Sequence, residues 1–192
     1  MKKNGFTLVE LLAMLVVLGI LMGVAIPNIS GIIKNNKLNI IKADVVKMID
    51  TAKVKMSTDK AINQKPTHGQ CIVMALNYLN VNEDINTGPN GGKYLLFDSF
   101  VVITREDTLT SKKYKYYVRL IEQTGNQQFG VDLIERTKLT ESNSDYIQKI
   151  TDKYDLDGGS QKMDDDKEIL REKLRDKCEN GIIGYYPGDK LK

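Results

Sequence analysis

The sequence has little excess charge of either sign, a single histidine and only two cysteines. Its 28 lysines and arginines nearly balance 25 acidic residues, which leaves a formal net charge of +3. Charge alone therefore gives no support for nucleic acid or an anionic membrane surface as a partner. The one histidine, His68, lies three residues before Cys71. No third group that would orient its imidazole for thiol catalysis can be identified, so we expect a loop histidine beside a structural cysteine.

Cys71 and Cys178 are the two cysteines of the chain. They could be two separate buried thiols, because a free cysteine packs well as a small apolar residue. They could also pair, and a disulfide that closes a loop of about a hundred residues stabilises a fold by roughly 4–5 kcal/mol on the loop-entropy model. The sequence leaves both alternatives open.

Acidic residues near the C-terminus could supply oxygen ligands to a calcium ion, namely Asp155, Asp157 and Asp164. The EF-hand spacing fails, because Gly159 stands where a third ligand is needed and Asp166 where the final glutamate is needed. A solvated acidic turn followed by the start of a helix is favoured. We therefore expect no metal site and no cofactor.

One long apolar run does occur, over residues 6–26, and only Thr7 and Glu10 interrupt it. About 20 residues of helix span the roughly 30 Å hydrocarbon layer of a membrane. Lys2 and Lys3 would keep the N-terminal end in the cytoplasm, with the rest of the chain outside. Glu10 would cost on the order of 2.5–3.5 kcal/mol in such a helix. Its carboxylate must snorkel to the interface or meet a cation from another chain.

Residues 5–12, Gly-Phe-Thr-Leu-Val-Glu-Leu-Leu, resemble the N-terminus of type IV pilins and of the pseudopilins of related secretion and DNA-uptake machines. The resemblance implies that a prepilin peptidase cleaves between Gly5 and Phe6 and methylates the new amine of Phe6. It also implies that Glu10 of one subunit offsets the Phe6 amine of a neighbour in a helical filament. A secretory signal peptide is disfavoured, because its apolar core is shorter, roughly 7–15 residues, and a small-residue cleavage site follows it.

The helical pattern continues beyond the apolar run to about Thr58, with apolar residues at spacings of three, four and seven. Pro27 removes a backbone hydrogen bond inside this helix at a cost of about 3 kcal/mol. Gly19 and Gly23 weaken the helix further. The segment from Gly19 to Pro27 is therefore predicted to bend or melt, and the resemblance implies the same for filaments of the family.

The remainder predicts a globular head. A polar loop leaves the long helix, and a second loop rich in glycine and asparagine lies at 86–92. Residues 70–79 fit either a short helix or a buried strand. Three runs with strand character follow, and a turn at 124–126 predicts a hairpin between the last two. The strands are 94–104, 114–123 and 128–136, and helices are predicted at 145–154 and 164–179.

The fold class is therefore predicted as α+β, a long N-terminal helix packed on an antiparallel sheet with an additional C-terminal helical region. The expected parts are a leader at 1–5, an apolar helix at 6–27, its amphipathic continuation at 28–58 and a head at 59–192.

Tyrosines and lysines of the head could form a surface that stacks on bases or sugars. Tyrosine is also an ordinary strand residue, and that interpretation is favoured. The residues concerned are Tyr114, Tyr116, Tyr117, Tyr185, Tyr186, Lys112, Lys113, Lys115 and Lys190.

The sequence thus predicts a structural subunit of a type IV pilus without enzymatic activity. Its implied partners are other pilin subunits, the prepilin peptidase, an assembly ATPase and a membrane platform protein. The precursor is expected to cross the cell membrane once with its head outside, and the mature subunit to lie in an extracellular filament that serves adhesion or motility. The length of the C-terminal region favours a minor subunit. A pseudopilin of a type II secretion or competence system is one alternative, and a membrane-anchored enzyme or ligand-binding head is another.

Overall fold

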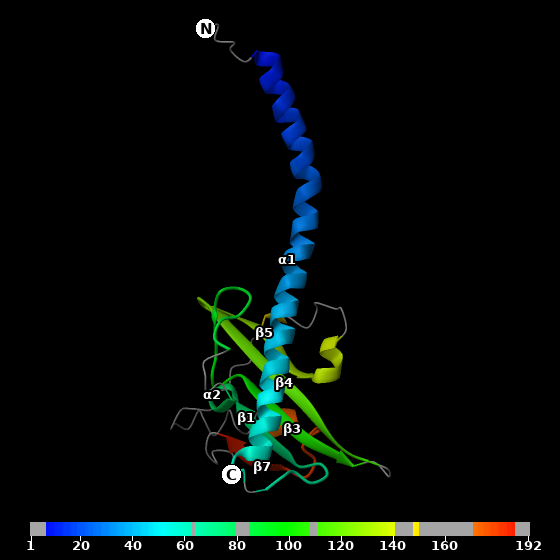
Figure 1. Cartoon of the computed structure of the whole chain (residues 1–192), viewed down its shortest axis with the longest axis vertical. Coiled ribbons are helices and arrows are strands. Elements are labelled where there is room, and N and C mark those ends of the chain that lie inside the picture. Colours follow the sequence, from blue (N-terminus) through cyan, green and yellow to red (C-terminus); the bar gives the residue numbers. More distant parts are fainter. Residues whose placement is uncertain are drawn as a thin grey trace. The chain divides into compact units, whose positions relative to one another are not determined.

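A computed structural model describes residues 7–62, 64–79, 85–107, 111–140, 148–149 and 171–186. The chain divides into two compact units, Met1–Lys37 and Leu38–Lys192. Helix α1, Leu8–Thr58, contributes residues to both (Figure 1). It ends where the apolar periodicity predicts, and residues 19–27 are helical in the single chain. Bending or melting of that segment in a filament stays a prediction.

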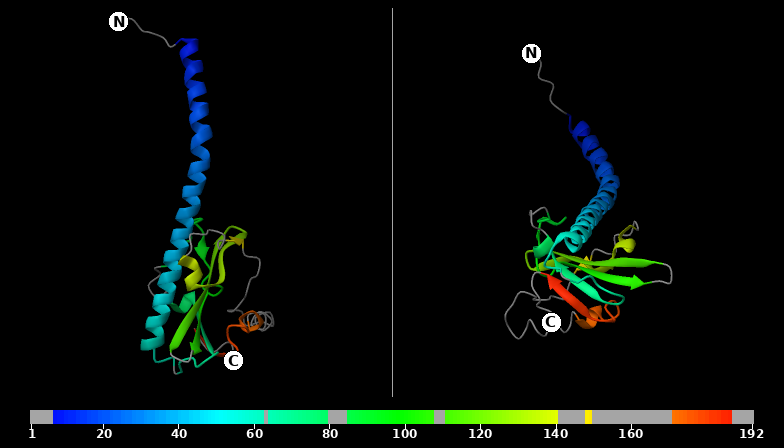
Figure 2. Two further views of the ribbon diagram at one scale, coloured as in Figure 1. Left: turned by 90° about the vertical axis from the view of Figure 1, so that its right-hand side faces the viewer. Right: turned by 60° about the horizontal axis from the view of Figure 1, so that its bottom comes forward.

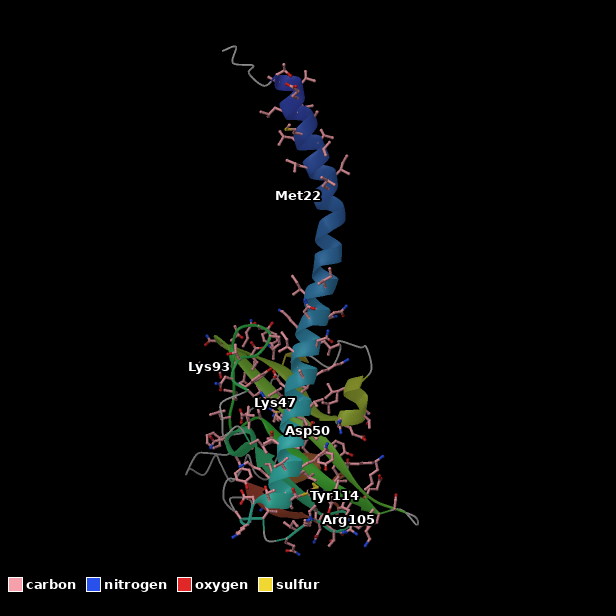
Figure 3. All side chains as sticks on the ribbon, viewed as in Figure 1. Met22, Lys47, Asp50, Lys93, Arg105 and Tyr114 are labelled. Atoms are coloured by element: carbon pink, nitrogen blue, oxygen red, sulfur yellow. A yellow bond between two sulfur atoms is a disulfide. The ribbon has the colours of Figure 1, made fainter. Side chains whose placement is uncertain are left out.

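The first unit contains the N-terminal part of α1, whose described side chains from residue 7 to residue 23 are all exposed. Leu8 is 82% exposed, and Met22, which is labelled in Figure 3, is 61% exposed. Within the part of the chain that the structure describes, no helix combines the length and the apolarity needed to cross a membrane.

The second unit is built on one sheet, whose described strands follow the order β6-β5-β4-β3-β1-β7, with β2 paired to β4. All pairings are antiparallel except the parallel pair of β1 and β7. The strands are β1 Cys71–Ala75, β2 Lys93–Tyr94, β3 Phe100–Asp107, β4 Lys112–Thr124, β5 Gln127–Glu135, β6 Gln148–Lys149 and β7 Ile182–Tyr186, and the short helices are α2 Leu76–Leu79 and η1 Arg136–Thr140.

One face of the sheet packs against the C-terminal half of α1. Val45 and Met48 of the helix are fully buried and belong to the same core as Ile103, Val118 and Leu120 of the strands. Each large apolar side chain buried in this way contributes roughly 1.5–3 kcal/mol. The predicted α+β fold, with a long helix covering one face of the sheet, is confirmed (Figure 2).

The opposite face of the sheet is covered by the start of the C-terminal segment, which is described over residues 171–186. Leu174 and Cys178 pack there against Val73, Phe100 and Val102. The left view of Figure 2 shows this segment and α1 on opposite sides of the sheet. The head therefore has two apolar layers, one on each side of a single sheet.

Four predicted elements differ from the structure. The predicted helix at 145–154 is a strand over its described residues, because Gln148 and Lys149 form β6 and pair with β5. Residues 70–79 form a strand and then a helix: β1 ends at Ala75, and α2 begins at Leu76, whose N–H donates to the Ser99 carbonyl. The predicted strand at 94–104 is interrupted, since β2 ends at Tyr94 and β3 begins at Phe100. The described part of the predicted helix at 164–179 is helical only over 171–174, and a short strand, β7, follows the turn at Gly181.

Candidate processing and assembly site

A reciprocal pair of hydrogen bonds joins Thr7 and Glu10 at the start of α1. The backbone N–H and the hydroxyl of Thr7 both donate to Glu10 Oε2, at 3.0 and 2.8 Å. The Glu10 N–H donates back to Thr7 Oγ1 at 3.3 Å. This is a capping box, in which two orphan donors of the first helical turn are satisfied. The sequence signal is Thr-x-x-Glu, and it was not among our predictions, which took only the charge of Glu10 into account.

The capping box leaves part of the Glu10 carboxylate available. An ionised carboxylate can accept about four hydrogen bonds. Only Oε2 accepts in the described residues, so Oε1 has no partner there. Glu10 can therefore cap its own helix and still bind a cation from outside the chain. Gly5 and Phe6, the predicted processing residues, lie outside the described residues.

Gly19 and Gly23 are not required by packing within this chain. A Cβ atom built at either position meets nothing within 4 Å. Their effect on the single chain is to weaken the helix, since glycine costs about 1 kcal/mol relative to alanine in a helix interior. Any close approach that needs these glycines must involve another molecule.

In the head, a disulfide joins Cys71 to Cys178 across 107 residues of sequence. It fixes the C-terminal segment to β1, so Cys71 is not a free thiol. His68 is a structural residue of the same region, because its Nδ1 accepts the backbone N–H of Asp107 at 3.1 Å. Asn180 donates to the His68 carbonyl at 2.8 Å. The histidine thus links the end of β3 to the C-terminal segment.

The predicted calcium ligands Asp155, Asp157 and Asp164 lie outside the described residues. Among the residues that the structure does describe, no three histidine, cysteine, aspartate or glutamate side chains gather in a way that could hold a metal ion.

The tyrosine and lysine surface is divided by the sheet. Tyr114 and Tyr116 lie on the side of β4 that packs toward α1. Tyr117 lies on the other side, where Lys177 Nζ is 5.5 Å from its ring centroid. Tyr185 and Tyr186 belong to β7, which is separated from β4 by β3 and β1 in the sheet. Lys190 is outside the described residues. The predicted set therefore does not form one surface.

An ion network that joins β4 and β5 to Lys173 of the C-terminal segment was not predicted. Arg119 donates to Asp132 at 2.6 Å, and Lys173 donates to the other carboxylate oxygen at 2.5 Å. The Arg119 side chain is completely buried. Opposite Arg119 the β5 strand bulges, and Leu133 takes a φ of 48°. The bulge inserts one extra residue into β5.

A second buried carboxylate, Glu122, holds the loop at 86–92. It accepts the backbone N–H groups of Asn90 at 2.9 Å and Gly92 at 2.7 Å. A Cβ atom at Gly88 would lie 2.4 Å from the Glu122 carboxyl carbon. Glycine is therefore required there because the loop closes around the carboxylate.

Comparison with known protein families finds a match at the N-terminus of the chain. Residues 1–26 match the prokaryotic N-terminal methylation motif. No curated protein matches the chain, and no solved structure matches it. The match covers the capping box at Thr7 and Glu10 together with Gly19 and Gly23.

Proposed function

We propose that the chain is a type IV pilin-like or pseudopilin-like protein. More specifically, it is a structural subunit of a type IV pilus. The observation that carries the proposal is the N-terminal methylation motif over residues 1–26. The family is generally structural, so the proposed role involves assembly and no catalysis by the chain itself.

The proposed first step is processing in the membrane. A prepilin peptidase cleaves after Gly5 and methylates the amine of Phe6, and an assembly ATPase with its platform protein then moves the subunit into the filament. Lys2 and Lys3 keep the leader in the cytoplasm, the apolar residues 6–26 cross the membrane, and the head lies outside.

The N-terminal part of α1 is exposed in the single chain, which supports a role in which it is covered first by lipid and then by neighbouring subunits. Its described apolar side chains are exposed on every side of the helix, and Leu8, Leu15 and Met22 are all more than half exposed. Contiguous apolar surface of this kind is unstable in water and marks a membrane or protein contact. We therefore propose lipid before assembly and neighbouring subunits after it.

Glu10 is the one charged side chain between Thr7 and Ile33. In the filament its Oε1 binds the Phe6 amine of a neighbouring subunit, while Oε2 keeps the capping box. A paired charge is far less costly to bury than an isolated one, and this makes Glu10 compatible with the packed interior.

Processing is tested by replacing Gly5 with valine and determining the N-terminus of the purified subunit by mass spectrometry. We expect wild-type subunits to begin at N-methylated Phe6 and the variant to retain its leader, because a bulky side chain blocks the cleavage position. Asn4→Ala serves as the matched control and should be processed. A wild-type subunit that keeps residues 1–5 would refute this proposal.

The kind of assembly is tested by immunogold labelling of cells with antibody to the head. Label along surface fibres supports a pilus subunit, and label confined to the cell envelope supports a pseudopilin instead. Glu10→Leu should still insert into the membrane and be cleaved, but it should no longer enter filaments. Wild-type amounts of filament from this variant would contradict the proposed pairing.

A further inference from the structure

A groove of about 410 Å³ opens within the second unit at the edge of β4, where residues 113–116 extend past the last pair with β5, Tyr117 with Glu135, so that side chains from both faces of the strand line it. It lies between β4 and the start of η1, and Figure 3 labels Tyr114 at this end of the sheet. Ligand pockets in proteins commonly measure roughly 300–1,000 Å³, so a group of one or two sugar rings would fit. Its lining residues are Lys113, Tyr114, Lys115, Tyr116, Glu135, Arg136 and Thr137.

Two tyrosines supply the aromatic part of the groove. Tyr114 and Tyr116 are two residues apart on one strand, so their rings point to the same side of the sheet. Both are partly buried and pack against the core. Lys53 of α1 places its Nζ 5.4 Å from the Tyr116 ring centroid, and Asp50 pairs with Lys53 at 2.8 Å. The rings are therefore held in place before a ligand arrives, which lowers the entropy lost on binding.

Two cations that line the groove are available to a ligand. Lys113 and Arg136 are exposed, and neither forms an ion pair within the described residues. Lys115 is already paired with Glu106 at 2.8 Å. Glu135 contributes a carboxylate, which accepts hydrogen bonds from hydroxyl groups. The groove thus offers aromatic faces, two available cations and one acceptor.

We propose that this groove binds an acidic carbohydrate. Sugar rings pack on Tyr114 and Tyr116, a sugar carboxylate binds Lys113 and Arg136, and Glu135 accepts sugar hydroxyls. A single-stranded nucleic acid fits less well, because a phosphate backbone requires a continuous positively charged track and Glu135 interrupts it. The proposal does not depend on the pilus assignment, since every residue that it uses belongs to the second unit, Leu38–Lys192.

The test titrates the full chain, purified in detergent micelles, with a trimer of galacturonic acid and follows binding by calorimetry. The neutral galactose trimer and an oligothymidylate are the comparison ligands. We expect the acidic trimer to bind with a Kd no weaker than about 1 mM and the neutral trimer to bind at least about tenfold more weakly. Equal affinity for the two trimers, or no heat with the acidic trimer at 10 mM, would overturn the proposal.

Variants separate the groove from the rest of the surface. Arg136→Ala should weaken binding by about tenfold or more, because it removes a charge-assisted hydrogen bond. Tyr114→Ala should do the same while Tyr114→Phe keeps near wild-type affinity, which shows that ring stacking and not folding is at fault. Lys138→Ala, a neighbouring exposed lysine outside the groove, is the matched control. Unchanged binding by Arg136→Ala, or tighter and strongly salt-dependent binding of the oligothymidylate, would reject the site as assigned.

Discussion

The ion network of Arg119, Asp132 and Lys173 makes a strong prediction about how the C-terminal segment is held. Asp132→Asn keeps the shape of the side chain but removes the negative charge that pairs with Arg119, whose side chain is completely buried. Breaking a buried pair in this way costs about 3–5 kcal/mol, because the remaining charge is left uncompensated. Lys173→Ala should cost at most about 1 kcal/mol, since the Lys173 side chain is 31% exposed and water partly replaces its partner.

The same network predicts how stability depends on pH. Burial raises the pKa of Asp132, but the hydrogen bond from Lys173 and the charge of Arg119 lower it by more, so it lies below its ordinary value. The unfolded state then binds the proton more tightly than the folded state. The contribution is therefore fully present above about pH 4, the ordinary aspartate value, and is lost as the pH falls through the folded pKa.

The measurement is denaturant unfolding of the full chain in detergent micelles with its disulfide intact, at pH 7 and in steps below pH 4. Asp50→Asn is the matched control, because Asp50 pairs with Lys53 at the surface and is 57% exposed. That control should change the unfolding free energy by less than about 0.5 kcal/mol. The reasoning is refuted if Asp132→Asn costs no more than the control, or if its cost stays constant as the pH falls below 4.

Three further changes test other parts of the fold by the same unfolding measurement. The double change Cys71→Ala and Cys178→Ala should lower the unfolding free energy by about 4–5 kcal/mol, and peptide mapping without reductant should find the two residues joined in the wild type. Gly130→Ala should cost more than about 2 kcal/mol, because its Cβ would lie 1.9 Å from a β4 carbonyl oxygen. Its control, Gly31→Ala, meets nothing within 4 Å and should stabilise the helix by about 0.5–1 kcal/mol. Burial raises the pKa of Asp44, so Asp44→Asn should leave the unfolding free energy at pH 7 unchanged or higher. The stabilising contribution of Asp44 is present below about pH 4 and is lost as the pH rises through its folded pKa, which is opposite in sign to that of Asp132.

The elements that the sequence predicts correctly are those with local signals. The apolar spacing of α1 continues to Thr58, where the helix ends. The hairpin of β4 and β5 closes through Gly125 and Asn126, and Gly125 takes the left-handed conformation that such a turn requires. Alternation along β4 also places Tyr114, Tyr116, Val118 and Leu120 on the side of α1. Each of these features depends on residues within a few positions of one another.

The missed features depend on distant residues. β7 is short, and its pairing with β1 brings together segments that are more than a hundred residues apart. The bulge at Leu133 places a branched residue at positive φ, which no local propensity favours. Arg119 looks like an exposed strand residue until Asp132 and Lys173 meet it. At the N-terminus the motif itself was readable, because residues 1–26 form a contiguous pattern.

The arrangement at Glu10 gives a physical reason why one carboxylate would control assembly of the proposed filament. The apolar side chains of α1 gain little when they leave lipid for neighbouring helices, because lipid tails are as apolar as leucine. The capping box is made within one chain, so it is equally present before and after the transfer. In the proposed filament, the interaction that would differ between the two environments is the one between Glu10 Oε1 and a cation of another subunit. Replacing Glu10 should therefore leave insertion and helix content nearly unchanged while filament formation is lost.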